Sequence, residues 1–153
     1  MIIELSQRPD LAGRAVQFFW ECWGNENNFP FYEDCIVHSI DHAVTLPTFY
    51  LALDQEDQIV GSYALLTNDL ISRQDFMPWF ACLFVVEAHR NKGIAGMLLA
   101  HGLNEAKNKG FSDLYLYTDL VNFYERKGWT YLCNGYTVSN QEVKIYRRET
   151  AEQ

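Results

Sequence analysis

A charged turn between an apolar strand and a leucine-rich helix is the first place where this sequence indicates chemistry. The stretch VVEAHRNKGIAGMLL, residues 85–99, carries a glycine-bearing junction at its centre. A strand that turns into a helix leaves backbone N–H groups unpaired at the positive end of the helix dipole, where phosphate groups bind. Gly93 permits close backbone approach, and the residues after it stay small. The predicted anion-binding residues are Arg90, Asn91, Lys92, Gly93, Ile94, Ala95 and Gly96.

The residues of the turn indicate which class of phosphate ligand it would bind. Arg90 and Lys92 add positive charge in a chain whose formal net charge is −8. The turn lacks the G-x-G-x-x-G order of dinucleotide-binding folds and the Lys-Ser/Thr of a P-loop, which argues against both classes. A diphosphate held without a metal ion fits better, although the motif alone leaves an ordinary glycine-softened turn open.

A second segment of chemical interest is NFYERKGW, residues 122–129. A phenol within hydrogen-bond reach of a leaving group can protonate it as a general acid. The phenol of Tyr124 is almost wholly protonated near neutral pH and has a proton to give. Packing of the ring in the core is the alternative interpretation of this residue.

The two segments together resemble the GNAT superfamily of acyl-CoA-dependent N-acyltransferases. RNKGIA, residues 90–95, resembles the family signature R/Q-x-x-G-x-G/A, whose turn cradles the pyrophosphate of coenzyme A. NFYERKGW resembles the FYEKxGF segment that follows the fifth strand of the family. The order and separation of the segments match as well. The resemblance runs from Thr48 to the C-terminus and includes similarity to a bacterial-type subgroup.

The resemblance implies an enzyme, an N-acetyltransferase that moves the acetyl group of acetyl-CoA to a primary amine by direct attack in a ternary complex. It implies that Tyr124 lies beside the sulfur as general acid. It also implies that Leu83, Phe84 and Val85 pair through their backbone with the pantetheine amides, while splayed strands polarise the thioester carbonyl. A catalytically silent acyl-CoA-binding sensor or interaction module of the same fold is the alternative. Retention of Tyr124 together with the phosphate turn favours the enzyme.

One position departs from the commoner family pattern. Family members have an Asn seven residues before the Tyr, and Tyr117 stands at that spacing here. The usual Asn contact to coenzyme A is therefore in question. Asn122 is the candidate to replace it.

The base that takes the proton of the amine has no single candidate in the sequence. Glu87 is beside the phosphate turn and too far along the strand to reach the amine. Four other carboxylates precede the central strand or lie near the first two helices: Asp69, Asp75, Glu21 and Asp34. A solvated surface position is the usual state of each such residue. A chain of waters is the other solution that the family uses.

Aromatic and acidic residues gather in the segment FFWECWGNENNFPFY, which suits an organic cation. The candidate cation-receiving wall consists of Trp20, Glu21, Trp23 and Asp34, although packing of the rings in a helix core explains them as well. The net charge of −8 favours the encounter with cations. We therefore expect a primary amine on a neutral or cationic small molecule or peptide, rather than on a polyanionic acceptor.

Metal and disulfide chemistry are not indicated. Asp34, His38 and His42 fall at i, i+4 and i+8 on one face of a predicted helix, but no further zinc ligands accompany them. A polar helix face, and no metal, is the prediction. The four cysteines are far apart without C-x-x-C spacing, which predicts reduced, buried thiols.

Hydrophobic periodicity and the positions of glycine and proline predict the elements that carry these residues. Helices are predicted for residues 9–24, 31–43, 97–110 and 121–128, and strands for 2–5, 48–54, 59–67, 79–86, 111–118, 129–133 and 143–148. They form an α/β (α+β) sandwich around a mixed central sheet. The resemblance implies a mostly antiparallel sheet with a splayed parallel pair and helices on both faces.

Composition limits the remaining classes. A chain of 153 residues with 48% hydrophobic and 21% charged residues is most simply one domain, residues 1–153. Its acidity argues against nucleic acid as a partner. No apolar run approaches the roughly 20 residues of a membrane span, and no signal core is apparent. We expect no membrane partner and a cytoplasmic location, and leave a homodimer open.

Overall fold

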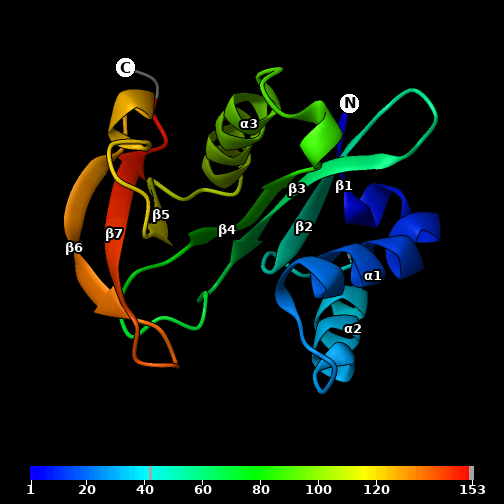
Figure 1. Cartoon of the computed structure of the whole chain (residues 1–153), viewed down its shortest axis with the longest axis horizontal. Coiled ribbons are helices and arrows are strands. Elements are labelled where there is room, and N and C mark those ends of the chain that lie inside the picture. The colour runs from blue at the N-terminus through cyan, green and yellow to red at the C-terminus, as the bar shows by residue number, and fades with distance from the viewer. Residues whose placement is uncertain (42, 152–153) are drawn as a thin grey trace. The chain divides into compact units, whose positions relative to one another are not determined.

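A seven-stranded sheet is the framework of the computed structural model, which describes residues 1–41 and 43–151 (Figure 1). The strands are β1 Ile2–Glu4, β2 Thr48–Leu53, β3 Ile59–Leu66, β4 Trp79–Val85, β5 Asp113–Thr118, β6 Thr130–Tyr136 and β7 Glu142–Glu149. Their order in the sheet is β1-β2-β3-β4-β5-β7-β6. The β4–β5 pair is parallel with Trp79 opposite Tyr115, whereas β1–β2, β5–β7 and β6–β7 are antiparallel. The predicted mixed, mostly antiparallel sheet is confirmed.

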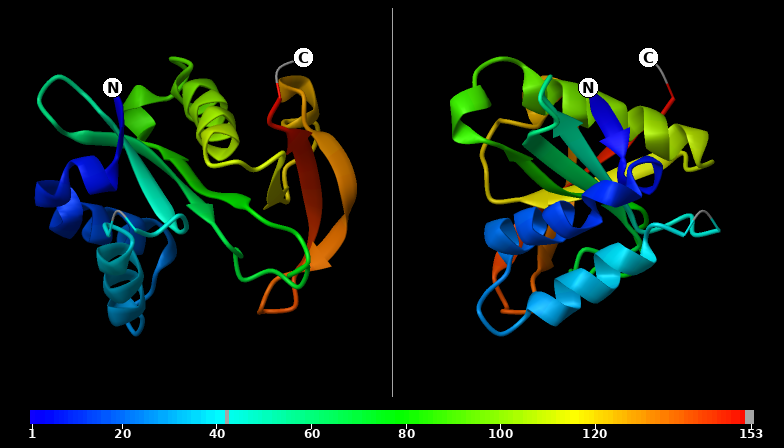
Figure 2. Two further views of the ribbon diagram at one scale, coloured as in Figure 1. Left: turned by 180° about the vertical axis from the view of Figure 1, so that it is seen from behind. Right: turned by 90° about the vertical axis from the view of Figure 1, so that its right-hand side faces the viewer.

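Three α-helices and four short 3-10 turns connect the strands among the described residues. The α-helices are α1 Ala12–Trp23, α2 Phe29–His38 and α3 Ile94–Asn108. The 3-10 turns are η1 Leu5–Gln7, η2 Pro9–Leu11, η3 Glu87–His89 and η4 Glu125–Lys127. Figure 2 shows α1 and α2 side by side in both views, which agrees with their packing against each other.

The chain divides into two compact units, each made of two separate stretches of sequence. Unit 1 contains Met1–Ala64 and Cys82–Leu99, and unit 2 contains Leu65–Ala81 and the chain from Ala100 onward. The chain therefore passes from one unit to the other within β3, within β4 and within α3.

Helices cover both faces of the strands in unit 1. Side chains alternate along a strand, so Phe49 and Ala52 of β2 point to opposite faces. Phe49 contacts Phe19 of α1, with ring centroids 5.1 Å apart. On the other face, a Cβ added at Gly61 of β3 would lie 3.5 Å from the Cβ of Ala52 and 3.2 Å from Cδ1 of Leu98 in α3. The expectation of helices on both faces is confirmed.

A buried cluster organises unit 2. Its members come from β4, β7 and the connection between β3 and β4, and they are Ile71, Trp79, Val143 and Ile145. Phe76 stacks on Tyr115 of β5 with ring centroids 4.8 Å apart, and Tyr117 packs edge-on against Trp79. Strands β5 and β7 and the β3–β4 connection thus pack around the indole ring of Trp79.

The predicted helix over residues 121–128 is wrong. The structure has only the single turn η4, Glu125–Lys127, because left-handed residues lie on both sides of it. Asn122 has a φ of 62° and Gly128 has a φ of 86°, and neither value continues a right-handed helix.

Candidate functional site

The predicted phosphate turn lies in unit 1, and its backbone donors are open. Asn91 and Gly93 have φ values of 63° and 81°, which turn the chain into α3 at Ile94. Within the described part of the chain, the N–H groups of residues 91–96 donate no hydrogen bond. The first bond of the helix runs from Met97 N to the carbonyl oxygen of Gly93, at 3.1 Å. Six successive backbone donors are therefore available at the positive end of a helix of 15 residues.

Space at the turn is also open. A Cβ added at Gly93 would meet no heavy atom within 4 Å, so glycine is required here by its φ and not by a crowded neighbour. Asn91, Lys92 and Gly93 are exposed, and Ile94 to Gly96 are half-buried. A row of free N–H groups in a turn without an obstructing side chain at Gly93 fits an anion such as a pyrophosphate.

The two cations of the turn behave differently. Arg90 donates from Nε to the carbonyl oxygen of Val85 at 2.8 Å, and its guanidinium lies 5.4 Å from the ring centroid of Phe84. These contacts of Arg90 connect the turn to the end of β4. Lys92 is exposed and has no hydrogen bond or ion pair within the described residues, so its charge is available to a ligand.

β4 changes character at Cys82, which no sequence pattern indicated. Cys82 has a φ of 58°, uncommon for a residue with a side chain, and Ser62 Oγ donates to its carbonyl oxygen at 2.9 Å. Before this point the strand is buried, and after it Leu83, Phe84 and Val85 are half-buried. The strand is distorted where unit 2 gives way to unit 1, next to the backbone that the resemblance assigns to pantetheine.

Tyr124 lies in unit 2 at the start of η4. Its side chain is 8% exposed and contacts the rings of Trp129 and Tyr146, with centroids 6.2 and 6.0 Å away. Burial raises the pKa of the phenol, so Tyr124 stays protonated at neutral pH. Its hydroxyl makes no hydrogen bond to the described residues. A protonated and unengaged phenol is what a proton donor requires.

Tyr117, at the family's Asn position, and Asn122, its candidate replacement, have separate environments. Tyr117 packs against Trp79 in the core cluster of unit 2, with ring centroids 6.4 Å apart. Asn122 is exposed in the loop before η4. The structure thus gives Tyr117 a packing role and leaves the side chain of Asn122 at the surface.

Most of the carboxylates considered as bases are ordinary surface groups. Asp75 pairs with Arg73 at 2.7 Å, which lowers the pKa of the carboxyl, and its side chain is 58% exposed. The side chain of Asp34 is 81% exposed. Glu21 accepts a hydrogen bond from Gln17 Nε2 at 2.7 Å. These groups lie at the surface, and none of them has a property that favours a base.

Asp69 differs from the others. It lies in unit 2 in the connection between β3 and β4, held between Asn68, whose Oδ1 accepts from Ile71 N at 3.1 Å, and Leu70, whose φ is 52°. Its carboxyl makes no hydrogen bond or ion pair with the described residues. Burial raises the pKa of Asp69 to about 7, because the charged form loses hydration without gaining a partner. A carboxyl with this pKa exchanges protons readily at neutral pH.

The two tryptophans of the predicted cation-receiving wall, Trp20 and Trp23, differ in their contacts and in their exposure. Trp20 donates from its indole to the carbonyl oxygen of Asn25 at 2.7 Å and contacts Phe29, which places it inside the α1–α2 connection. Trp23 is 39% exposed and contacts the ring of Phe84 edge-on. Of the two tryptophans of the predicted wall, Trp20 is half-buried and Trp23 is the more exposed.

The described residues considered for a metal site are exposed, and the cysteines are half-buried. His38 Nδ1 lies 3.3 Å from a carboxylate oxygen of Asp34, both groups are exposed, and His42 lies outside the described residues. Among residues 1–41 and 43–151, no three His, Cys, Asp or Glu side chains are grouped to hold a metal ion. None of the four cysteines forms a disulfide, and all four are half-buried, so the expected burial of the thiols is only partial.

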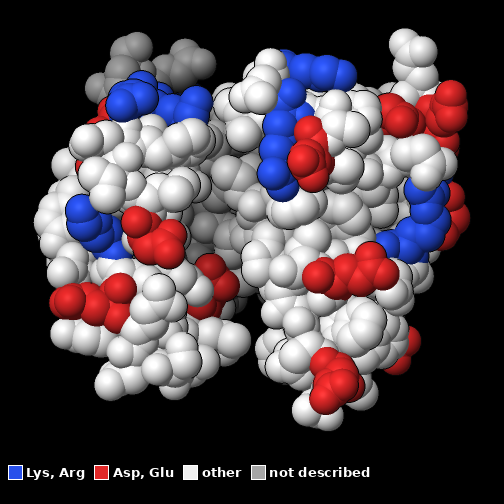
Figure 3. Space-filling model, in the orientation of Figure 1, with Lys and Arg blue, Asp and Glu red and all other residues white. Residues whose placement is uncertain are grey.

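Charged side chains are mixed on the molecular surface drawn in Figure 3. Lysine and arginine do not form one continuous patch on that face, and acidic groups lie between them. No helix of the described residues is long and apolar enough to cross a membrane.

The comparison with protein families decides the class. A family model described as the acetyltransferase (GNAT) family matches residues 13–129, which is most of the chain and includes both the phosphate turn and Tyr124. The chain belongs to the acetyltransferase (GNAT) family. The expectation of a GNAT-type N-acetyltransferase enzyme is confirmed, whereas the roles of individual residues stay predictions. None of the curated proteins compared matches the sequence.

Solved structures share the fold of this GNAT protein at low sequence identity. An aminoglycoside 6′-N-acetyltransferase complexed with coenzyme A is 15% identical with a TM-score of 0.72, over 100% of this chain and 98% of that one. The aminoglycoside 6′-N-acetyltransferase from Enterococcus faecium is 18% identical with a TM-score of 0.69, over 100% and 98%. A chimeric spermidine N-acetyltransferase that includes the Vibrio cholerae protein is 16% identical with a TM-score of 0.70, over 98% and 96%.

Proposed function

We propose that this GNAT acetyltransferase transfers the acetyl group of acetyl-CoA to a primary amine of a small molecule or peptide by direct attack in a ternary complex. The observation that carries the proposal is the row of six open N–H groups at residues 91–96. Together with Lys92 they would bind the pyrophosphate of the co-substrate without a metal ion. The family match and a structural relative that contains coenzyme A support this assignment.

The backbone of β4 would bind the rest of the co-substrate. Leu83, Phe84 and Val85 would pair with the pantetheine amides as an added strand does. The carbonyl of Val85 already accepts from Arg90, so the other backbone groups of this stretch are the better partners. Asn122 would provide the contact that the family usually makes through an Asn at the position of Tyr117.

Tyr124 would act as the general acid. The amine nitrogen forms a bond to the acetyl carbon, the carbon–sulfur bond breaks, and the sulfur takes the phenolic proton. Solvent then returns a proton to Tyr124. The buried phenol supports the role because its raised pKa keeps the proton in place until the thiolate leaves.

Asp69 is our proposed base for the amine proton. Among the carboxylates that the sequence offered, it is the one with a pKa raised toward neutrality and no competing ion pair to any residue that the structure describes. A base must be deprotonated to act, so the rate would rise with pH through about 7.

The acceptor would be a neutral or cationic amine. The net charge of −8 and the exposed face of Trp23 support this choice. Structural relatives named as aminoglycoside and spermidine N-acetyltransferases act on amine compounds of that kind. We also propose that residues 1–153 work as one domain, and the homodimer and the cytoplasmic location stay predictions.

A screen of amines with acetyl-CoA, read out by thiol release, tests this function. Matched cationic and anionic amines are assayed at low and high salt. Thiol release with cationic amines that persists at high salt supports both the reaction and the acceptor class. A consistent preference for anionic amines at high salt contradicts the acceptor class. Coenzyme A binding without turnover on any amine indicates the silent binding module instead.

A further inference from the structure

Strand β7 contacts both ends of the turn that carries Tyr124. Tyr146 Oη donates to Glu125 Oε2 at 2.6 Å, at the first residue of η4. Arg148 donates from Nη1 to the carbonyl oxygen of Lys127, the last residue of η4. Tyr146 and Arg148 are two residues apart on one strand and therefore point to the same face of it.

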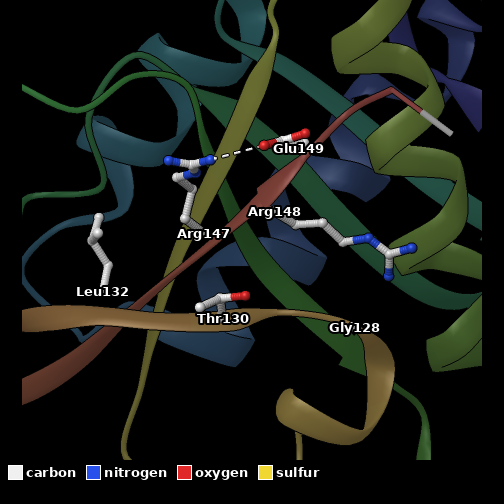
Figure 4. Close-up of a pocket in the computed structure, with 6 residues that line it drawn as sticks. All are labelled: Gly128, Thr130, Leu132, Arg147, Arg148 and Glu149. Atoms are coloured by element: carbon white, nitrogen blue, oxygen red, sulfur yellow. Dashed lines mark hydrogen bonds and ion pairs between the residues drawn. The ribbon is translucent and has the colours of Figure 1, made fainter. Parts of the chain in front are cut away.

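The end of the turn is shaped around Arg148. Gly128 follows η4 with a φ of 86°, and a Cβ added there would lie 2.8 Å from Nη1 of Arg148. The guanidinium therefore packs directly on the glycine. Figure 4 shows Arg147 projecting from β7 away from Arg148 and joined to Glu149, at 3.2 Å, beside a cavity of about 450 Å³. Arg147 and Arg148 thus have different partners.

The side chain of Tyr124 makes no hydrogen bond to residues 1–41 and 43–151 that would orient it. Its hydroxyl is unengaged within the described residues, so its position depends on its backbone and its ring contacts. The carbonyl oxygen of Tyr124 accepts from Lys127 N at 3.0 Å and from Trp129 N at 3.1 Å, which ties it to η4. The ring of Tyr146 contacts the ring of Tyr124 as well. Movement of η4 would therefore move the phenol.

We propose that Tyr146 and Glu125 are positioning residues for Tyr124. The hydrogen bond between them links a strand residue that is 1% exposed to the turn, so the turn is anchored to the core of unit 2. This anchoring leaves the Tyr124 hydroxyl free to give its proton while fixing where that proton is presented. The inference rests on the proposed role of Tyr124 as general acid.

Tyr146→Phe tests the inference, because it removes the hydroxyl and keeps the ring that packs on Tyr124. We expect kcat to fall about 10-fold, as for loss of one hydrogen bond to a charged group, with the KM for acetyl-CoA unchanged. Tyr131→Phe is the matched control. The ring of Tyr131 also packs on Tyr146, but its hydroxyl donates to Asn134 at 2.6 Å and does not touch η4. Its kcat should equal that of the wild type.

Two substitutions of Glu125, the hydrogen-bond partner of Tyr146, provide a second test. Glu125→Gln keeps an oxygen that accepts from Tyr146 and should retain most of kcat, whereas Glu125→Ala should match Tyr146→Phe. Because Glu125 is exposed, neither change is expected to prevent folding. Equal kcat in wild type, Glu125→Ala and Tyr146→Phe would overturn the proposal.

Combination with Tyr124→Phe separates this inference from the proposed function. If Tyr146 acts through Tyr124, then Tyr146→Phe lowers kcat in the wild type and has no further effect in Tyr124→Phe. An equal fall in both backgrounds would show a general structural effect and overturn the positioning role. Unchanged kcat in Tyr124→Phe alone would instead remove the general acid, and with it the proposed mechanism.

Discussion

The phosphate turn in unit 1 and the tyrosine turn in unit 2 are built in opposite ways. At residues 91–96 the groups proposed to bind the ligand are backbone N–H groups, and the local sequence arranges them through a left-handed Asn91 and Gly93. At η4 the proposed functional group is one side chain, Tyr124, and contacts from β7, some 20 residues further along the chain, hold the turn. The first turn is locally encoded, and the second depends on tertiary structure.

This difference has a consequence for mutations. Changes at the phosphate turn should alter binding of acetyl-CoA, because the turn provides hydrogen-bond donors and no group that reacts. Changes at the tyrosine turn should alter turnover, because the phenol is proposed to protonate the departing thiolate. The two turns are therefore expected to separate KM from kcat.

The largest effect is expected for Tyr124→Phe. This change keeps the ring contacts to Trp129 and Tyr146 and removes the proton donor. Turnover should fall by roughly 10²–10⁴-fold, with the KM for acetyl-CoA nearly constant. Steady-state kinetics under conditions where chemistry limits the rate check this. A large rise in KM with normal kcat would show that Tyr124 contributes to binding of acetyl-CoA and not to turnover.

Asp69→Asn should have the next largest effect on turnover, about 100-fold if the carboxylate is the base. In the wild type, kcat/KM should rise with pH through about 7, the pKa of Asp69. The variant should lose that rise. A pH profile that keeps the same rise in Asp69→Asn would exclude this carboxyl as its source.

Stability gives an independent check on Asp69. Its pKa in the folded state is about 7, above that of an unfolded chain, so folding favours the protonated form. The resulting contribution to stability is complete below about pH 4 and is lost as the pH rises through about 7. Asp69→Asn should therefore melt at a higher temperature than the wild type at pH 8, and at a similar temperature at pH 4. A lower melting temperature at pH 8 would contradict a half-buried carboxylate that has no partner among the described residues.

The smallest effect is expected for Gly93→Ala. Added atoms meet no neighbour, so the cost is the strain of an L-residue at a φ of 81°. That strain is of order 1 kcal/mol and corresponds to about a 5-fold weaker affinity for coenzyme A. Titration with coenzyme A measures it. A loss of 100-fold or more would mean that the site is more crowded than the structure shows.

The sequence predicted the locally encoded features well. The strand–turn–helix junction was correct because β-branched residues, glycine and the leucine-rich helix act within a few residues of each other. The helix expected at 121–128 failed because positive φ at Asn122 and Gly128 restricts it to one turn. Contacts such as Tyr146 with Glu125, and the left-handed Cys82 within β4, depend on residues distant in sequence and have no local pattern.

The open N–H groups of residues 91–96 are proposed to bind coenzyme A, and calorimetric titration of Gly93→Glu with coenzyme A measures this binding. Glutamate adds a bulky negative charge within the row of donors. Gly13→Glu is the matched control, because Gly13 is exposed on α1 and a Cβ there also meets nothing within 4 Å. We predict that Gly93→Glu binds about 100-fold more weakly than the wild type, while Gly13→Glu and Tyr124→Phe bind normally. Wild-type affinity in Gly93→Glu would contradict binding of coenzyme A by these N–H groups.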